Sequence, residues 1–205
     1  MTGLSMPQIP QADLTGLVLA GGQSRRWNGV DKAWVRLANR PLVAHVAERL
    51  ASQTGVVWIN ANRDLDRYAA LGPPVFTDDW PDALGPLAGI ASALRRIETP
   101  WLLVAPVDSP RLPLDLGARL GEAALREGRM LATVHDGERL QPAFLLIHQA
   151  RAGDLVQAVA QGTRRLGDWV AAQQPAQVDA RTLGWMDALR GANTPAELGA
   201  LAQGA

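Results

Sequence analysis

The chain has 205 residues, a length that supports one substantial hydrophobic core and is short for two. Twenty basic side chains balance twenty acidic ones, so no overall field favours nucleic acid or a membrane surface as a partner. The absence of cysteine excludes a disulfide framework, a thiolate nucleophile and a cysteine-ligated zinc site. Because the sequence has neither a membrane-length apolar segment nor a signal-peptide pattern, we expect a cytoplasmic protein.

The start of the chain predicts an irregular segment followed by a buried strand. Residues 1–13 mix Pro, Gln, Ser and Thr without periodicity, so we expect a disordered extension ahead of a single domain over residues 14–205. The short apolar run over residues 17–20 is typical of a buried strand. We then expect a short edge segment at residues 33–37 and a helix at residues 41–53, which begins with proline and keeps helical apolar spacing.

From there on, strand patterns alternate with helix patterns. The run from Trp101 to Ala105 is almost wholly apolar, which suits a central strand buried on both faces. The predicted strands span residues 56–59, 73–78, 101–105, 130–134, 143–147 and 177–179. The predicted helices span residues 64–71, 87–97, 113–127, 153–172 with a break near Gly162, and a last segment that opens at Pro195.

This alternation predicts an α/β protein with a three-layer, Rossmann-like architecture: a mostly parallel central sheet with helices on both faces. The connection between residues 134 and 143 is too short for a crossover helix, so we expect one antiparallel strand there. In open sheets of this kind ligands bind beyond the carboxyl ends of the strands. The residues that follow the predicted strand ends are Gly21-Gly22, Asn60, Asp78, Asp108 and His135. We expect them to form one composite site.

The stretch LTGLVLAGGQSRRWNGVDK carries the strongest functional signal. Gly21-Gly22 lets the backbone approach a ligand closely because no Cβ stands in the way. Arg25, Arg26 and Lys32 add positive charge, so we interpret the stretch as a loop that holds polyphosphate. Its spacing is neither that of a Walker A loop nor that of a dinucleotide-binding fingerprint. The simpler alternative is an ordinary turn with solvated arginines.

The catalytic motifs that the sequence has and lacks favour phosphoryl or nucleotidyl transfer. The sequence lacks a nucleophilic cysteine, a G-x-S-x-G elbow and a carboxylate pair of glycosidase type. A phosphate nucleophile is already anionic and needs no general base, and such transfers depend on positioning and charge stabilisation. Asp108 can hold Mg²⁺, a cation that proteins bind through one or two carboxylates plus substrate phosphates.

LAGGQSRRWNGVDK resembles the L-A-G-G-x-S-x-R-M-G-x-D-K signature of nucleotidyltransferases, and further blocks resemble the molybdenum cofactor guanylyltransferase family in the same order. Those blocks, which extend the resemblance over nearly the whole chain, are NANR (60–63), Asp78, GPLAG (85–89), PVDSP (106–110), HDGER (135–139) and NTP (193–195). Two positions depart from the family pattern. Trp27-Asn28 stands where the family usually has Met-Gly, and Ala192 precedes Asn193 where the family commonly has another asparagine.

The resemblance implies a nucleotidyltransferase fold and a definite reaction: GMP passes from GTP to the terminal phosphate of molybdopterin, which gives the guanine dinucleotide form of the molybdenum cofactor and pyrophosphate. It implies Mg²⁺ as cofactor, with Mn²⁺ as a substitute, and as protein partners other molybdenum cofactor biosynthesis proteins and molybdoenzyme chaperones. The residues expected to bind GTP are Leu19, Ala20, Gly21, Gly22, Arg26, Lys32, Asn60, Asp78 and Asp108. Arg25, Lys32 and Asp108 are the expected catalytic residues, Asp108 the metal ligand, Gly85 and Gly89 the pocket wall, and His135 and Asn193 the residues nearer the pterin.

Some of these residues have a structural explanation as well. Asp78 can cap or solvate its loop, Asn60 can satisfy backbone groups at a strand end, and Asn193 can cap the last helix. His135 can be an ordinary half-exposed histidine at the end of a strand.

Two rival functions stay open. One is a sister enzyme with another nucleotide or acceptor, such as a molybdopterin cytidylyltransferase or a sugar-phosphate nucleotidyltransferase; LAGG and GPLAG favour guanylyl transfer over it. The other is a nucleotide-binding regulatory protein without turnover. The joint presence of Arg25, Lys32 and Asp108 argues against this second rival.

Overall fold

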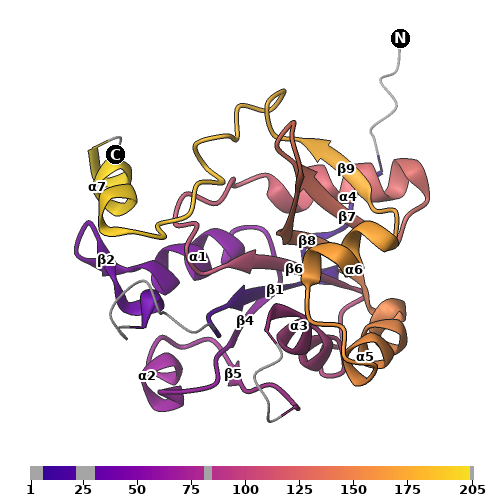
Figure 1. Ribbon diagram of the computed structural model, residues 1–205, viewed down its shortest axis with the longest axis horizontal. Helices are drawn as coiled ribbons and strands as arrows, with labels where there is room; N and C mark the ends of the chain where they lie inside the picture. Colours follow the sequence, from indigo (N-terminus) through magenta and orange to yellow (C-terminus); the bar gives the residue numbers. More distant parts are fainter. Residues whose placement is uncertain (1–6, 22–30, 81–84, 204–205) are drawn as a thin grey trace.

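The computed structural model describes residues 7–21, 31–80 and 85–203, and its centre is a seven-stranded sheet with the order β5-β4-β1-β6-β8-β7-β9 (Figure 1). These strands are β1 (Leu14–Leu19), β4 (Val56–Asn60), β5 (Val75–Phe76), β6 (Trp101–Pro106), β7 (Leu131–His135), β8 (Leu140–His148) and β9 (Ala176–Asp179). β8 runs antiparallel to β6 and β7, and the other neighbouring pairs of this sheet are parallel. The predicted sheet, mostly parallel with one antiparallel strand, is confirmed.

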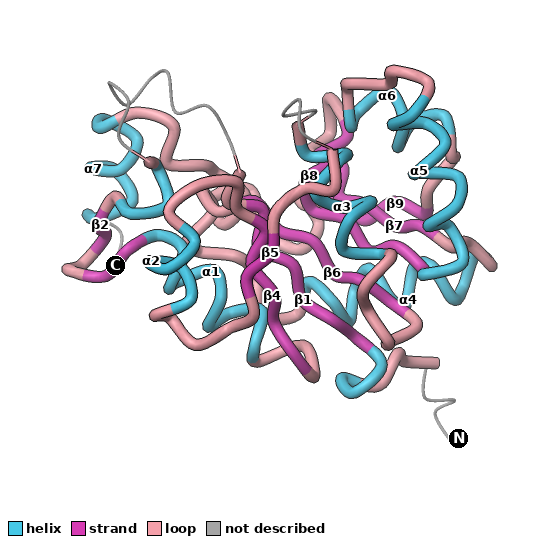
Figure 2. The backbone as a smooth tube through the Cα atoms, turned by 90° about the horizontal axis from the view of Figure 1, so that it is seen from below, coloured by secondary structure: helices cyan, strands magenta, loops and turns pink. Residues whose placement is uncertain are grey.

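Helices cover both faces of the sheet and complete the three layers. They are α1 (Leu42–Ala51), α2 (Leu65–Ala69), α3 (Pro86–Leu94), α4 (Leu116–Glu127), α5 (Ala152–Ala160), α6 (Leu166–Ala172) and α7 (Pro195–Gln203). Buried side chains of α1 and α4 form one core cluster, and those of α3, α5 and α6 form the other. In Figures 1 and 2, α5 and α6 lie together at one end of the molecule, whereas α7 lies beside β2 at the other end.

The central strands are apolar throughout because they are buried on both faces. In β1, Val18 belongs to the core cluster beneath α1 and α4, whereas its neighbours Leu17 and Leu19 belong to the cluster beneath α3. β6 alternates in the same way, with Leu103 in the first cluster and Leu102 in the second. Side chains of a strand point alternately to its two faces, so a strand with a helical layer on each face needs a continuous apolar run.

The structure differs from the sequence-based expectation at two segments. Of the predicted N-terminal extension, residues 1–6 lie outside the described residues. Within residues 7–13, Ile9 packs against the core, and Gln11–Asp13 form a 3-10 helix in which the Gln11 side chain donates a hydrogen bond to the Thr54 carbonyl oxygen at 3.1 Å. The expected edge segment at 33–37 is a 3-10 helix, Lys32–Trp34, followed by a two-stranded hairpin. Its strands are β2 (Arg36–Leu37) and β3 (Arg40–Pro41).

The topology brings the carboxyl ends of β1, β4, β5, β6 and β7 to one edge of the sheet, because these strands share a direction. The antiparallel β8 begins at that same edge, so the turn between β7 and β8, residues 136–139, lies there too. Among the helices of the described part of the chain, none is both long and apolar enough to cross a membrane.

Candidate functional site

A short ion pair lies at the middle of this edge. Lys32 Nζ is 2.6 Å from Asp108 Oδ2, and it also donates a hydrogen bond to Asn193 Oδ1 at 2.7 Å. The Lys32 and Asp108 side chains are 15% and 22% exposed, so both remain within reach of a ligand. A Cβ on Gly191 would lie 2.9 Å from Asp108 Oδ2, so glycine lets the C-terminal segment approach this closely. Segments far apart in the sequence thus meet at one charged centre.

Lys32 is held in place by the residue before it. Asp31 caps the 3-10 helix, since its Oδ1 accepts a hydrogen bond from the Ala33 backbone N–H at 3.1 Å. Its Oδ2 accepts a hydrogen bond from the Tyr68 hydroxyl at 2.8 Å and pairs with Arg63 Nε at 3.5 Å. Burial, and then the hydrogen bond with Asp31, raise the pKa of Tyr68 well above its ordinary value, so its hydroxyl stays a donor. These contacts fix the position of the backbone at Lys32.

A second polar cluster follows β4 and β5. Asp78 Oδ1 accepts a hydrogen bond from Asn60 Nδ2 at 2.9 Å, and Oδ2 accepts one from Asn62 Nδ2 at 2.8 Å. The Asp78 backbone N–H in turn donates to Asn62 Oδ1 at 2.9 Å, which closes a two-bond ring between these residues. The two asparagines thereby fix the orientation of the carboxylate. As far as the described residues go, two of its four acceptor positions remain for a ligand.

The two glycines of the GPLAG block have different roles. Gly85 precedes α3 with a φ of 77°, a left-handed conformation that side chains disfavour. Gly89 lies inside α3, where an added Cβ would lie 2.2 Å from Asn60 Oδ1. Gly89 therefore leaves room for the Asn60 amide instead of forming part of a pocket wall.

Three connected hollows run along the edge. The Asn60 pocket, of about 440 Å³, is lined by Ala20, Gly21, Asp31, Asn60, Ala61, Asn62, Arg63, Tyr68, Asp78, Gly85 and Pro86. The central pocket, of about 220 Å³, is lined by Leu19, Ala20, Gly21, Asp31, Lys32, Pro86, Pro106, Val107, Asp108 and Ala143. It shares Ala20, Gly21, Asp31 and Pro86 with the Asn60 pocket, so the two are continuous.

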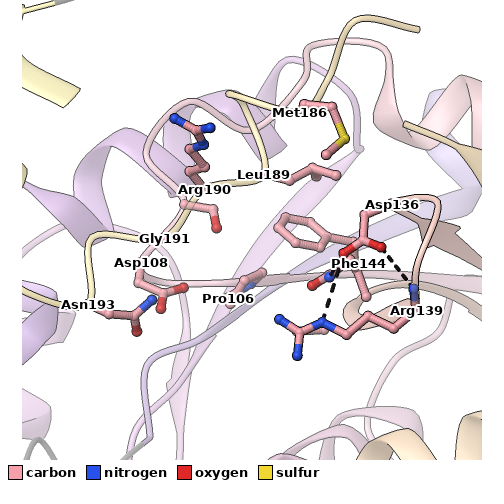
Figure 3. A pocket seen from close by; sticks show the side chains of 13 residues that line it. Pro106, Asp108, Asp136, Arg139, Phe144, Met186, Leu189, Arg190, Gly191 and Asn193 are labelled. Atoms are coloured by element: carbon pink, nitrogen blue, oxygen red, sulfur yellow. Dashed lines mark hydrogen bonds and ion pairs between the residues drawn. The ribbon is translucent and has the colours of Figure 1, made fainter. Parts of the chain in front are cut away.

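The third hollow, the Phe144 pocket of about 420 Å³, adjoins the central pocket through Pro106, Asp108 and Ala143 (Figure 3). Its lining mixes apolar side chains with charged ones. The lining residues are Pro106, Asp108, Ser109, Asp136, Arg139, Gln141, Ala143, Phe144, Met186, Leu189, Arg190, Gly191 and Asn193. The ion pair between Lys32 and Asp108 therefore lies in the central pocket, which connects the Asn60 pocket with the Phe144 pocket.

Most of the residues predicted from the sequence meet at this edge. Those that line one of the three pockets are Leu19, Ala20, Gly21, Lys32, Asn60, Asp78, Gly85, Asp108 and Asn193. Gly22, Arg25 and Arg26 lie outside the described residues.

His135 is not among the residues that line these pockets, and its neighbour Asp136 is. The ring Nδ1 of His135 instead accepts a hydrogen bond from the Gly137 backbone N–H at 2.9 Å. Adjacent side chains at a strand end diverge, so position alone could not tell which of these two residues reaches the pocket.

Sequence reasoning missed Asn62, Tyr68 and Arg139 as site residues. Asn62 and Arg139 belong to the NANR and HDGER blocks, so the blocks marked the right segments without separating ligand-facing side chains from others. Tyr68 carried no signal, because its hydrogen bond joins positions 37 residues apart in the chain.

The residues present fit a magnesium ion that substrate helps to hold. In the described part of the chain, no three His, Asp or Glu side chains are grouped as a preformed metal site. Asp108 Oδ1 makes no hydrogen bond to another described residue, so it can serve as a ligand. One carboxylate, completed by phosphate and water oxygens, is a donor set that Mg²⁺ accepts.

The three-layer fold and a charged centre between two pockets at the carboxyl edge define a nucleotidyltransferase. Residues 16–178 match the MobA-like NTP transferase domain, and the chain belongs to this family.

Relatives and solved structures agree with this assignment. The chain is 42% identical over 197 residues to a molybdenum cofactor guanylyltransferase of Bordetella petrii, with 93% of this chain and 97% of the relative covered. It is 43% identical over 165 residues to one of Pasteurella multocida, with 80% and 87% covered. The structure of molybdopterin-guanine dinucleotide biosynthesis protein A from Archaeoglobus fulgidus superposes with a TM-score of 0.76 at 22% identity, covering 92% of this chain and 97% of that one.

Proposed function

We propose that the protein transfers GMP from GTP to the terminal phosphate of molybdopterin, which yields the guanine dinucleotide form of the molybdenum cofactor and pyrophosphate. The names of relatives that match this chain over most of its length support this assignment. The single observation that carries it is the Lys32–Asp108 pair between two pockets on one edge. A transfer reaction needs two substrates that meet at one charged centre, and this arrangement provides it.

The nucleotide belongs on the side of the Asn60 pocket. Guanine presents two neighbouring donors, N1–H and the N2 amino group, and Asp78 keeps two acceptor positions once Asn60 and Asn62 are bonded. Adenine has no such donor pair, so it would leave these two acceptor positions of Asp78 unfilled. An acceptor that a bound base covers without pairing costs about 1–3 kcal/mol, which corresponds to roughly tenfold discrimination or more.

In the transfer step, an oxygen of the acceptor phosphate attacks the α-phosphorus of GTP and forms a new P–O bond. The bond between the α-phosphorus and the oxygen that bridges to the β-phosphate breaks, and pyrophosphate leaves with that electron pair. Lys32 stabilises the negative charge that develops on the leaving group. The attacking phosphate is anionic, so the chain need not supply a general base.

Mg²⁺, or Mn²⁺ in its place, belongs to this proposal. When bound, the metal would polarise the α-phosphate and offset the charge of the triphosphate. Asp108 would hold it through Oδ1 while Oδ2 keeps its contact with Lys32. Asn193 limits how far Lys32 can turn away, since it binds the same ammonium group.

We also propose a cytoplasmic location, with molybdenum cofactor biosynthesis proteins and molybdoenzyme chaperones as protein partners. The cysteine-free sequence is compatible with a reducing compartment. The relatives are named molybdenum cofactor guanylyltransferases, which supports partners that handle the same cofactor.

The test is a binding titration with Mg²⁺ and each of GTP, CTP, ATP and UTP, together with pyrophosphate release when molybdopterin is added. We expect at least tenfold tighter binding of GTP than of the others, and loss of most of that preference in Asp78→Asn. Equal affinity for GTP and CTP would favour the cytidylyltransferase alternative. Tight GTP binding without pyrophosphate release would favour a regulatory binding protein.

A further inference from the structure

We propose that Arg139 binds the phosphate monoester of the acceptor and thereby positions it for attack. This inference rests on the proposed function, since it names a residue for the second substrate of that transfer. Arg139 does not line the Asn60 pocket or the central pocket. It lines the Phe144 pocket together with Asp108. Figure 3 shows its guanidinium extending from the β7–β8 turn into the space beside Pro106 and Phe144.

The turn that carries Arg139 is held rigidly. Asp136 Oδ1 accepts hydrogen bonds from the backbone N–H groups of Glu138 and Arg139, both at 2.9 Å, and the Asp136 N–H donates to the Arg139 carbonyl oxygen at 3.1 Å. Gly137 supplies the left-handed residue of the turn, with a φ of 101°. A cation on a fixed turn loses less conformational freedom when it binds an anion.

The contacts of the Arg139 side chain leave its binding face free. Nε is 3.9 Å from Asp136 Oδ2, and the side chain is 80% exposed. The terminal nitrogens Nη1 and Nη2 make no hydrogen bond to any residue in the described part of the chain. An exposed pair at this separation contributes little to stability, so folding does not explain an arginine here. A planar guanidinium that can donate from two terminal nitrogens matches the geometry of a phosphate.

The positive charge of Arg139 would reduce the repulsion between the two anionic substrates. The attacking phosphate and the triphosphate are both anions, and they must approach to bonding distance. Lys32 lies on the nucleotide side of Asp108, in the central pocket, and does not line the Phe144 pocket. Asp108 itself adds negative charge to that pocket. A guanidinium on its far wall would offset the charge of the acceptor phosphate without competing for the triphosphate.

A second arginine of the same pocket fits this role less well. Arg190 is 75% exposed and its Nη1 is 3.4 Å from Asp187 Oδ1, so one of its terminal nitrogens already has an anionic partner. In Figure 3 its guanidinium extends away from Asp108 and not toward it.

The experiment compares Arg139→Gln with Glu138→Gln, which removes one charge from the same turn at a side chain that does not line the pocket. The first measurement gives the KM of molybdopterin and of GTP. The second uses phenyl phosphate as a probe, observed by ³¹P line broadening with the nucleotide site saturated by a GTP analogue whose α–β bridge is a methylene group. Arg139→Lys tests whether the planar fork is needed in addition to the charge.

We expect Arg139→Gln to raise the acceptor KM and weaken phenyl phosphate binding by about tenfold or more, with GTP affinity within twofold of the parent enzyme. Glu138→Gln should match the parent enzyme in both measurements. Unchanged phenyl phosphate binding and acceptor KM in Arg139→Gln would overturn the inference, as would an equal loss of GTP affinity. Arg139-dependent binding of phenyl phosphate in a protein that releases no pyrophosphate would uphold the inference and refute the proposed function.

Discussion

Lys32 and Asp108 neutralise each other at 2.6 Å, and this contact decides what each residue can do for a substrate. Triphosphate oxygens would compete with Asp108 for the ammonium group, and a metal would bind Oδ1 of the carboxylate while Lys32 stays at Oδ2. The partial exposure of both side chains leaves them accessible to these ligands. The two residues therefore act as a coupled pair, and a change in one releases the other.

Lys32→Ala should weaken GTP binding and slow turnover, because it removes a compact positive charge from the position of the leaving phosphates. GMP lacks the β- and γ-phosphates, so its affinity should change much less. Calorimetric titration of both nucleotides measures the difference. An equal loss for GTP and GMP would make Lys32 a structural residue of its loop.

Asp108→Asn keeps the shape of the side chain and removes the charge that would hold a metal. We expect turnover to fall by two orders of magnitude or more, on the order of 3 kcal/mol of transition-state stabilisation. GTP should still bind but with most of its Mg²⁺ dependence lost. The ion pair with Lys32 is partly exposed, so the free energy of unfolding should fall by no more than about 1 kcal/mol. Near-normal Mg²⁺-dependent transfer by this variant would refute the metal assignment.

Helix α3 shapes the nucleotide pocket through a glycine, Gly89, which has no side chain. Gly89 leaves space for Asn60, which orients Asp78, so the helix contributes to the site through this glycine as well as through Pro86, which lines the pocket. Asn62 completes the orientation from the other side. The polar residues Asn60 and Asp78 follow the ends of strands β4 and β5, and Gly89 of helix α3 leaves the space that the Asn60 side chain occupies.

Gly89→Ala should displace the Asn60 amide, because the new Cβ would lie 2.2 Å from Oδ1 and 2.8 Å from Cγ. We expect the free energy of unfolding to fall by about 1–3 kcal/mol and GTP affinity to fall about tenfold. Gly153→Ala in α5 is the matched control, since its Cβ would meet nothing within 4 Å. Urea unfolding of that control should show unchanged or slightly higher stability. Equal behaviour of the two variants would contradict the role given to Gly89.

The strands and most helices were predictable because burial on two faces imposes an apolar run and helix faces keep their spacing. β1 and β6 were found in this way, and so was the reversal of β8, from the length of the connection alone. The short β2–β3 hairpin was not, because two-residue strands carry no periodicity. Within the site, the sequence marked the strand ends but could not separate His135 from Asp136, or foresee that Gly89 serves Asn60. Those distinctions depend on side-chain direction and on contacts between distant residues.

Across the whole molecule, lowered carboxyl pKa values should make the fold sensitive to acid, and the two largest reductions lie at the β7–β9 end of the sheet. Backbone N–H groups of Arg139 and Glu138 lower the pKa of Asp136 from 3.8 to about 2, and the Arg181 guanidinium lowers the pKa of Asp179 likewise to about 2. A carboxylate whose pKa is lower in the folded state stabilises the fold above the unfolded pKa. This stabilisation disappears as the pH falls through the folded pKa.

We therefore expect the free energy of unfolding to decrease between about pH 4 and pH 2. Asp136→Asn removes one of these carboxylates, so the free energy of unfolding of the variant should change less over that interval. Denaturant titrations at pH 5 and pH 2.5 measure how much the free energy of unfolding falls in the parent protein and in the variant. The same loss in the variant and the parent protein would show that Asp136 does not contribute.

The reversed direction of β8 has a consequence for how such a protein can diversify. Parallel strands end at the active edge and return through helices, so each loop at their ends leads into a helical layer. The β7–β8 turn reaches the same edge on a self-contained hairpin, and residues 136–139 can be exchanged without moving a helix. The nucleotide half of the site lies on other strands. Selection can therefore alter the acceptor through one exchangeable turn while the nucleotide that is cleaved stays the same.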